Sequence, residues 1–139
     1  MNKFFEKLFD LDKFKFSKIK VKKNVIFGMI EFAKANYPKE FMALLEGEIK
    51  EDALIITNII YQPFGKSKTS ASIVMNPNIY HIFGSVHSHP SLTNNPSKTD
   101  LMSFNKRGVA HFIINFPYQI KNIFCYNNKG NRIDFEIVN

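Results

Sequence analysis

Two histidines and an aspartate are spaced so that they could hold one metal ion. His87 and His89 are separated by one residue, and Asp100 follows after residues 90–99. In an extended strand, side chains two residues apart leave on the same face, so both imidazoles can reach one ion. The connection is long enough to fold back and bring Asp100 to the same point. Two imidazoles and one carboxylate leave the fourth tetrahedral position for water, which is the arrangement of a catalytic zinc site.

Each half of this pattern also has a simpler explanation. In a chain with four histidines, an H-x-H pair alone is weak evidence, because chance produces such pairs. Ser97 and Asp100 form an S-x-x-D sequence, which resembles a capping box with an acidic residue in the favourable first turn of a helix. The two pairs together, with Pro90 and Pro96 between them and a glutamate upstream, favour a metal site.

Iron is the competing metal, because two histidines and one carboxylate also form the facial triad of non-haem oxygenases. That triad commonly begins with H-x-D/E and places its last histidine much later, whereas here the two histidines come first. A zinc deaminase is disfavoured because its P-C-x-x-C segment is absent. Zinc is therefore the expected cofactor.

Two helices are expected to position these residues. Apolar residues recur at helical spacing over 23–35, and Pro38 should end that helix. A second helix should open at Ser97, directly after the polar loop 90–96. This second helix would carry the predicted carboxylate ligand in its first turn.

The remaining elements are expected to be strands of one sheet. In chain order they are a short strand from residue 19 and longer ones over 40–48, 53–61, 81–88, 110–116, 120–126 and 132–138. Glu51 and Asp52 should form the turn of a hairpin, and residues 127–130 a second turn. The order predicts one α/β unit in which two main helices flank the sheet.

Composition limits the class of protein and of metal site. With 139 residues and 45% hydrophobic content, the chain can fill the core of one domain. The single cysteine, Cys125, excludes a disulfide framework and a cysteine-rich zinc cage, which suits a reducing cytoplasm, and we expect a buried, inert thiol there. No apolar run matches a secretory signal, and residues 108–120 are too short to span a bilayer, so we expect no transmembrane helix.

The N-terminal part of the chain is expected to be separable from the rest. Residues 1–17 are predicted to form an amphipathic extension, and residues 18–139 the main domain. The apolar face of this extension would carry Phe4, Phe5, Leu8, Phe9 and Leu11. Such a helix could dock on the domain's own surface, on a partner or on a membrane surface.

Taken together, these motifs resemble the JAMM, or MPN-plus, family of metalloproteases. The family signature is an upstream glutamate, then H-S/T-H-P, seven further residues and S-x-x-D. Here it is represented by Glu40, His87-Ser-His89-Pro and Ser97-Lys-Thr-Asp100. The segment 38–47 also matches the family's pattern around the glutamate, except that Ala43 stands where glycine is more usual.

The resemblance implies a role for each of these residues and a fold. His87, His89 and Asp100 would be the zinc ligands, Glu40 the general base and then acid, and Ser97 a stabiliser of the tetrahedral oxyanion. The implied fold is the α/β JAMM/MPN type, which is cytidine-deaminase-like, with a mixed, mostly antiparallel sheet. Chemistry agrees with these roles, since the proton released by a metal-activated water needs an acceptor that can later protonate the leaving amine.

The family also implies the substrate class. Its members suggest a cytoplasmic isopeptidase or peptidase that cleaves after the C-terminal tail of a ubiquitin-like or sulfur-carrier protein. An extended tail could enter beside a sheet edge and present its carbonyl to the metal. The formal charge of +7 would favour an acidic modifier.

A different class of function is a non-catalytic module that binds protein or nucleic acid. The positive charge and the lysine-rich residues 13–23 motivate this alternative, but the charge is dispersed and no nucleic-acid motif accompanies it. Nucleic acid is therefore a disfavoured partner. His81 and His111 lie in apolar runs and are interpreted as hydrogen-bonded core histidines, and Gly65-Lys66-Ser67 as a loop.

Overall fold

A computed structural model of the chain describes residues 16–61, 81–104 and 108–139. Within these ranges, eight strands form one sheet in the order β7-β6-β5-β4-β2-β3-β1-β8. The strands are β1 (Lys18–Lys22), β2 (Met42–Lys50), β3 (Ala53–Tyr61), β4 (Ile82–His89), β5 (Ala110–Asn115), β6 (Ile123–Tyr126), β7 (Arg132–Ile133) and β8 (Glu136–Val138). The helices are α2 (Lys23–Asn36), α4 (Lys98–Phe104) and the short 3-10 turn η3 (Ile120–Asn122).

Strand directions in the sheet are mixed. The β2-β3, β2-β4, β5-β6 and β6-β7 pairs are antiparallel. The β1-β3, β1-β8 and β4-β5 pairs are parallel. The expected α/β fold, with a mixed and mostly antiparallel sheet flanked by two main helices, is confirmed.

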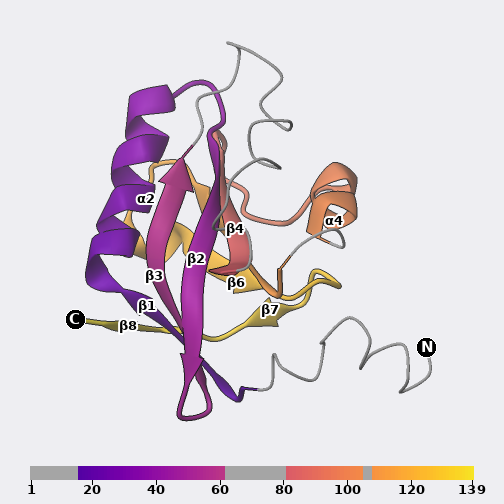
Figure 1. The fold of residues 1–139 in the computed structure, drawn as a ribbon. Helices are drawn as coiled ribbons and strands as arrows, with labels where there is room; N and C mark the ends of the chain where they lie inside the picture. The colour runs from indigo at the N-terminus through magenta and orange to yellow at the C-terminus, as the bar shows by residue number, and fades with distance from the viewer. Residues whose placement is uncertain (1–15, 62–80, 105–107) are drawn as a thin grey trace.

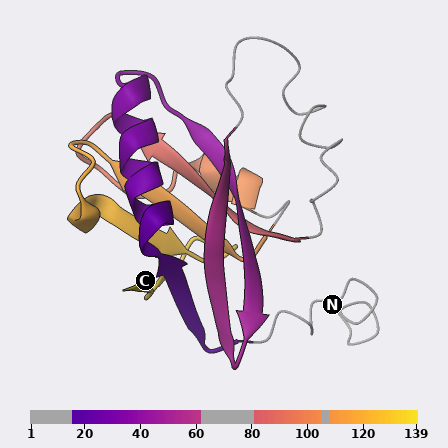
Figure 2. The same ribbon diagram turned by 60° about the vertical axis from the view of Figure 1, so that its left-hand side comes forward.

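The two helices cover opposite faces of the sheet (Figures 1 and 2). On one face, α2 buries Val25, Ile26 and Met29 in a cluster with Leu45 of β2 and Phe112 of β5. The opposite face carries a smaller cluster, in which Phe104 of α4 packs on Ile113 and Tyr126. Because strand side chains alternate between faces, neighbouring residues of β4 and β5 serve different clusters. The face under α4 is the one that carries the predicted site.

The sheet closes on itself at the C-terminal end of the chain, which corrects the single strand expected over 132–138. Only Asp134 and Phe135 separate β7 from β8, yet these strands lie at opposite ends of the strand order. Such a link spans about 11 Å at most, so the two edges must approach each other. Figure 1 shows β7 and β8 as one ribbon that crosses from one side of the sheet to the other.

A cleft of about 540 Å³ lies at this seam. Its lining includes Ile19 of β1, Ile133 of β7 and Val109, which precedes β5. None of the predicted site residues lines this cleft. The predicted chemistry therefore lies elsewhere in the fold.

Two other strand boundaries differ from the prediction. Residues 120–122 form η3 instead of the start of a strand, because Gln119 and Asn122 cap each other's main-chain groups. The strand expected from residue 40 begins at Met42, so Glu40 precedes it. The predicted hairpin turn is present, with Glu51 and Asp52 both at positive φ.

Some predictions fall on other parts of the chain. The amphipathic extension over residues 1–17 lies almost entirely outside the described residues, and the loop Gly65-Lys66-Ser67 lies wholly outside them. In the part of the chain that the structure describes, no helix is long and apolar enough to cross a membrane.

Gly84 sets the spacing between β4, the strand that carries His87 and His89, and its parallel neighbour β5. It is paired with Ala110, and a Cβ atom on Gly84 would lie 1.7 Å from the Ala110 carbonyl oxygen. No side chain can be accommodated there without moving one of the two backbones. Glycine at this position therefore allows the close approach of the β4 and β5 backbones three residues before His87.

We predict that Gly84→Ala lowers the free energy of unfolding by about 1–3 kcal/mol or more, because the added methyl group clashes with main-chain atoms. Urea denaturation measures the loss. The control is Gly28→Ala on α2, whose added Cβ meets only the end of the Ile59 side chain at 2.9 Å and gains about 1 kcal/mol of helix propensity. Equal stability of the two variants would contradict this account.

Candidate metal centre

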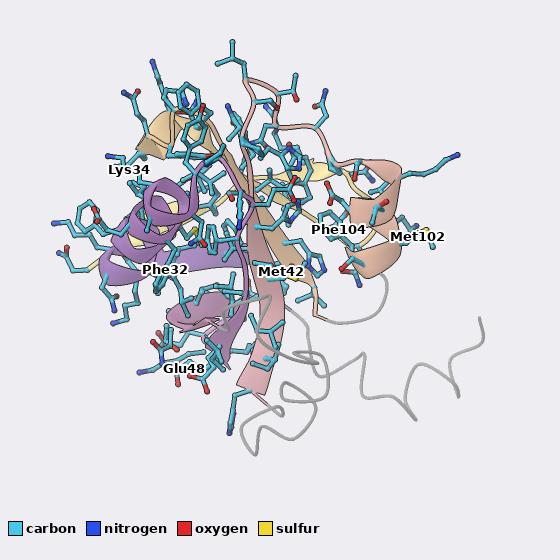
Figure 3. The ribbon with its side chains drawn as sticks, turned by 90° about the horizontal axis from the view of Figure 1, so that it is seen from above. Phe32, Lys34, Met42, Glu48, Met102 and Phe104 are labelled. Atoms are coloured by element: carbon cyan, nitrogen blue, oxygen red, sulfur yellow. The ribbon has the colours of Figure 1, made fainter. Side chains whose placement is uncertain are left out.

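The three predicted ligands come together where β4 ends and α4 begins. His87 and His89 are the sixth and eighth residues of β4, and Asp100 lies in the first turn of α4. Seen from above, Figure 3 places Met42 of β2 beside β4, with α2 on one side and α4, carrying Met102 and Phe104, on the other. Because α4 packs on this face of the sheet, Asp100 is brought back over the strand that carries both histidines.

The three side chains of this cluster are almost equally spaced, with 3.1 Å between the nearest polar atoms of each pair. The Nε2 atoms of His87 and His89 lie 3.1 Å apart. The Asp100 carboxylate places Oδ1 3.1 Å from His87 Nε2 and Oδ2 3.1 Å from His89 Nε2. Four ligands about 2.0 Å from a tetrahedral zinc lie about 3.3 Å from one another, so the triangle formed by these three side chains is close in size to one face of such a site.

The tautomer of His89 follows from its second ring nitrogen. Nδ1 lies 3.2 Å from the Thr93 carbonyl oxygen, which can only accept a hydrogen bond, so Nδ1 carries the proton and donates it. In the neutral ring, the lone pair of Nε2 then faces His87 and the Asp100 carboxylate. A cation placed among these atoms would be attracted by that lone pair and by the carboxylate.

Asp100 is held ionised, which is the form of a carboxyl group that can bind a metal ion. Burial would raise its pKa, but the hydrogen bonds from His87 and from the Ser97 N–H outweigh burial and hold the pKa of Asp100 well below its usual value. The Ser97 N–H donates to Asp100 Oδ2 at 2.8 Å. Two imidazoles and one ionised carboxylate at these distances fit zinc by donor type, number and spacing.

Ser97 is an N-cap, so the simpler explanation of the S-x-x-D pair also describes the structure. Its Oγ accepts the Asp100 N–H at 3.1 Å, while its own N–H donates to the Asp100 carboxylate. This pair of bonds is the capping box anticipated from the sequence. The hydroxyl proton of Ser97 takes no part in either bond, so the group retains a donor that it could direct at a substrate.

Glu40 lies just before β2 and is exposed. In the antiparallel β2-β4 pair, Met42 is opposite His87. The Ser88 N–H donates to the Phe41 carbonyl oxygen at 3.0 Å, one residue before this pair, and Glu40 comes directly before Phe41. Burial raises the pKa of the Tyr118 phenol, and so do the charges of Tyr37 and Glu40, so the Glu40 carboxylate lies within electrostatic range of that phenol.

His111 is a hydrogen-bonded core histidine, as expected, and it packs against Phe104 of α4. It is 1% exposed, and its ring stacks on Phe104, which in turn lies beside His87. Nδ1 contacts Ser85 Oγ and Nε2 contacts Asn128 Oδ1, both at 2.8 Å. Burial lowers the pKa of His111 to about 4, so the ring is neutral.

The same interpretation is wrong for His81, whose side chain is exposed. The strand begins one residue later, at Ile82, which leaves His81 at its solvent end. Cys125 is buried as expected, and burial raises the pKa of its thiol, which disfavours the reactive thiolate.

Asn94 anchors the loop between β4 and α4 to the sheet. The sequence alone does not predict this role. Its Nδ2 lies 2.7 Å from Asn115 Oδ1 and 2.9 Å from the carbonyl oxygens of Ile113 and Asn122. The Tyr126 hydroxyl donates to Asn94 Oδ1 at 2.6 Å. These bonds fix the loop residue that follows Thr93, the partner of His89. Only the fold brings these groups together, so an asparagine in a polar loop gave no indication of this role.

Comparisons with known proteins agree with this site. The family model for prokaryotic homologs of the JAB domain matches residues 22–126. A "Probable metalloprotease" of Haloferax volcanii is 30% identical over 118 residues, which cover 78% of this chain and 73% of the relative.

Solved structures show the same likeness. The chain is similar to a JAB1/MPN domain protein from Archaeoglobus fulgidus, with 32% identity, a TM-score of 0.68 and coverage of 88% of this chain and 99% of that one. It is also similar to a structure described as a JAMM metalloprotease-like zinc site in the proteasome and signalosome, with 31% identity, a TM-score of 0.68 and coverage of 88% and 100%. A protein of Desulfitobacterium hafniense shares the fold at 18% identity, a TM-score of 0.60 and coverage of 86% and 91%.

We predict that Asn94→Ala weakens zinc binding about 10-fold to 100-fold, because the loop that orients His89 loses its anchor to the sheet. The variant also leaves buried partners unpaired, which costs about 1–3 kcal/mol of stability. Competition with a chelator measures the affinity for zinc. The control is Asn95→Ala, since the neighbouring asparagine is exposed. Indistinguishable zinc affinities in the two variants would refute the anchoring role.

Proposed function

Because the chain belongs to the family of prokaryotic homologs of the JAB domain, we propose that it is a zinc-dependent metalloprotease of the JAMM type. The observation that carries this proposal is the convergence of His87, His89 and Asp100, whose nearest nitrogen and oxygen atoms are 3.1 Å apart for each pair of residues. The proposed reaction is hydrolysis of the amide or isopeptide bond that follows the C-terminal tail of a ubiquitin-like or sulfur-carrier protein.

In this proposal each side chain has a distinct task. His87, His89 and Asp100 hold the zinc. When bound, zinc supplies Lewis-acid polarisation of the scissile carbonyl and lowers the pKa of a water molecule to about 7. Glu40 accepts the proton of the attacking water and later delivers it to the leaving amine. Its place directly before Phe41, which is hydrogen-bonded to Ser88 between the two histidines, supports this assignment.

Ser97 is proposed to stabilise the oxyanion. Its Oγ receives the Asp100 N–H, so the hydroxyl proton is available for the negative oxygen of the tetrahedral state. Because Ser97 also caps α4, the group that would contact the oxyanion is rigidly tied to the helix that carries a ligand.

The surroundings of the site suit an extended apolar tail. Leu92 in the loop after β4 is 77% exposed, and Met102 of α4 is 64% exposed. Apolar side chains exposed beside a site are candidates for substrate contact. The formal charge of +7 would attract an acidic modifier. The single reduced cysteine supports the cytoplasm as the proposed compartment.

We predict that the zinc-loaded protein cleaves fusions in which the Gly-Gly tail of a ubiquitin-like protein is joined to a reporter. Cleavage should stop when a chelator removes the metal and return when zinc is restored, which gel electrophoresis and mass spectrometry of the products would follow. Linear and lysine-linked fusions distinguish peptide from isopeptide hydrolysis. The absence of metal-dependent cleavage across several such modifiers would count against the proposed substrate class.

We predict that Glu40→Gln keeps one zinc per chain and lowers kcat roughly 100-fold to 10,000-fold, because the proton acceptor is lost while the ligands remain. Zinc analysis and steady-state kinetics on the Gly-Gly fusion measure both quantities. Glu48→Gln is the matched control, since Glu48 is exposed on β2, the strand that follows Glu40. If Glu40→Gln turned over at the parental rate, Glu40 would not be the base.

A further inference from the structure

Ser88 lies between the two histidine ligands but faces the other side of β4. It is 0% exposed, whereas His89 on the opposite face is partly open to solvent. Side chains alternate along a strand, so the hydroxyl of Ser88 cannot join the metal site. It instead reaches the strand segment that follows Glu40.

Two hydrogen bonds join Ser88 to Phe41. The Phe41 N–H donates to Ser88 Oγ at 2.9 Å, and the Ser88 N–H donates to the Phe41 carbonyl oxygen at 3.0 Å. In a regular antiparallel pair, both acceptors are main-chain carbonyl oxygens. Here the serine hydroxyl takes the part of one of them, at the position where the regular β2-β4 pairing ends.

The peptide group held by this hydroxyl is the one that carries Glu40. The N–H of Phe41 belongs to the planar unit that includes the Cα and carbonyl of Glu40. Regular pairing with β4 begins only at Met42, opposite His87, and the Glu40 side chain is exposed. Before Glu40, Lys39 N–H bonds to Asn36 O, within the turn that leaves α2. The Ser88 hydroxyl therefore ties the backbone of Glu40 to the strand that carries both histidines.

We propose that Ser88 is a positioning residue that sets the Glu40 carboxylate relative to the metal ligands. The proposal rests on the proposed function, because it takes Glu40 to be the base. Ser88 touches neither substrate nor metal and acts through the Glu40–Phe41 peptide group. A displacement of about 1 Å at a reacting group can cost about 100-fold in rate, so the loss of one well-placed hydroxyl has a measurable consequence.

The first readout does not depend on activity. Ser88→Ala removes the acceptor of the Phe41 N–H, so that amide should exchange with deuterium faster than in the parent when followed by NMR. Ser88→Thr keeps the oxygen and should restore the protection. The matched control is Ser85→Ala on the same strand, whose hydroxyl bonds His111 and not Phe41. Unchanged protection of the Phe41 amide in Ser88→Ala would overturn the proposal.

The second readout is kinetic and uses the Gly-Gly fusion as substrate. Ser88→Ala should lower kcat about 10-fold to 100-fold while KM and zinc content stay near the parental values, and Ser88→Thr should recover most of the loss. In a Glu40→Gln background, Ser88→Ala should cause no further loss of kcat, because the group it positions is gone. An additional loss of the same size in that background, or parental kcat in Ser88→Ala, would overturn the proposal.

Failure of the catalytic role of Glu40 can be distinguished from failure of the positioning role of Ser88. Parental kcat in Glu40→Gln would refute the catalytic role of Glu40, and with it the positioning role, whatever the exchange of the Phe41 amide shows. If Ser88→Ala does not fold, Ser88→Cys carries the test, because sulfur fills a similar volume but accepts hydrogen bonds weakly. Reduced kcat with parental KM and zinc content in Ser88→Cys supports the proposal, and parental kcat overturns it.

Discussion

Two imidazoles and one carboxylate meet within hydrogen-bonding distance of one another at the end of β4, and their nitrogen and oxygen atoms could all be ligands of one cation. His87 and His89 reach it because they alternate on one strand, and Asp100 reaches it because α4 folds back over that strand. Burial would raise the pKa of Asp100, but the hydrogen bonds from His87 and from the Ser97 N–H outweigh it and keep the carboxyl ionised. The rest of the fold holds this triangle in place, and a cation of the right size would hold it more firmly.

The support for the triangle comes from groups on both faces of the sheet. Asn94 binds the ligand loop to β5 and β6, and Gly84 allows β4 to lie close against β5. On the opposite face, Ser88 connects the ligand strand to the peptide of Glu40. A site built this way is rigid because main-chain atoms of several elements are fixed directly, not through long flexible side chains.

Much of this arrangement could be predicted from local sequence patterns. Alternation along a strand placed His87 and His89 on one face, and the capping pattern placed Ser97 and Asp100 at the start of a helix. What could not be predicted depends on contacts between distant residues. The bond between Ser88 and Phe41 joins positions 47 residues apart. The break between β7 and β8 exists because β7 pairs with the preceding strand β6, whereas β8 pairs with β1 at the far end of the chain. The apolar residues around His81 predict a core position for it, which is wrong because the strand begins only at Ile82.

The central claim is that one zinc ion binds among these three side chains, and anomalous diffraction at the zinc edge from crystals of the zinc-loaded protein tests it most directly. The account predicts one strong peak per chain, about 2.0–2.2 Å from Nε2 of His87, Nε2 of His89 and a carboxylate oxygen of Asp100. A peak at other residues, or one at the histidines with Asp100 turned away from the ion, would contradict it.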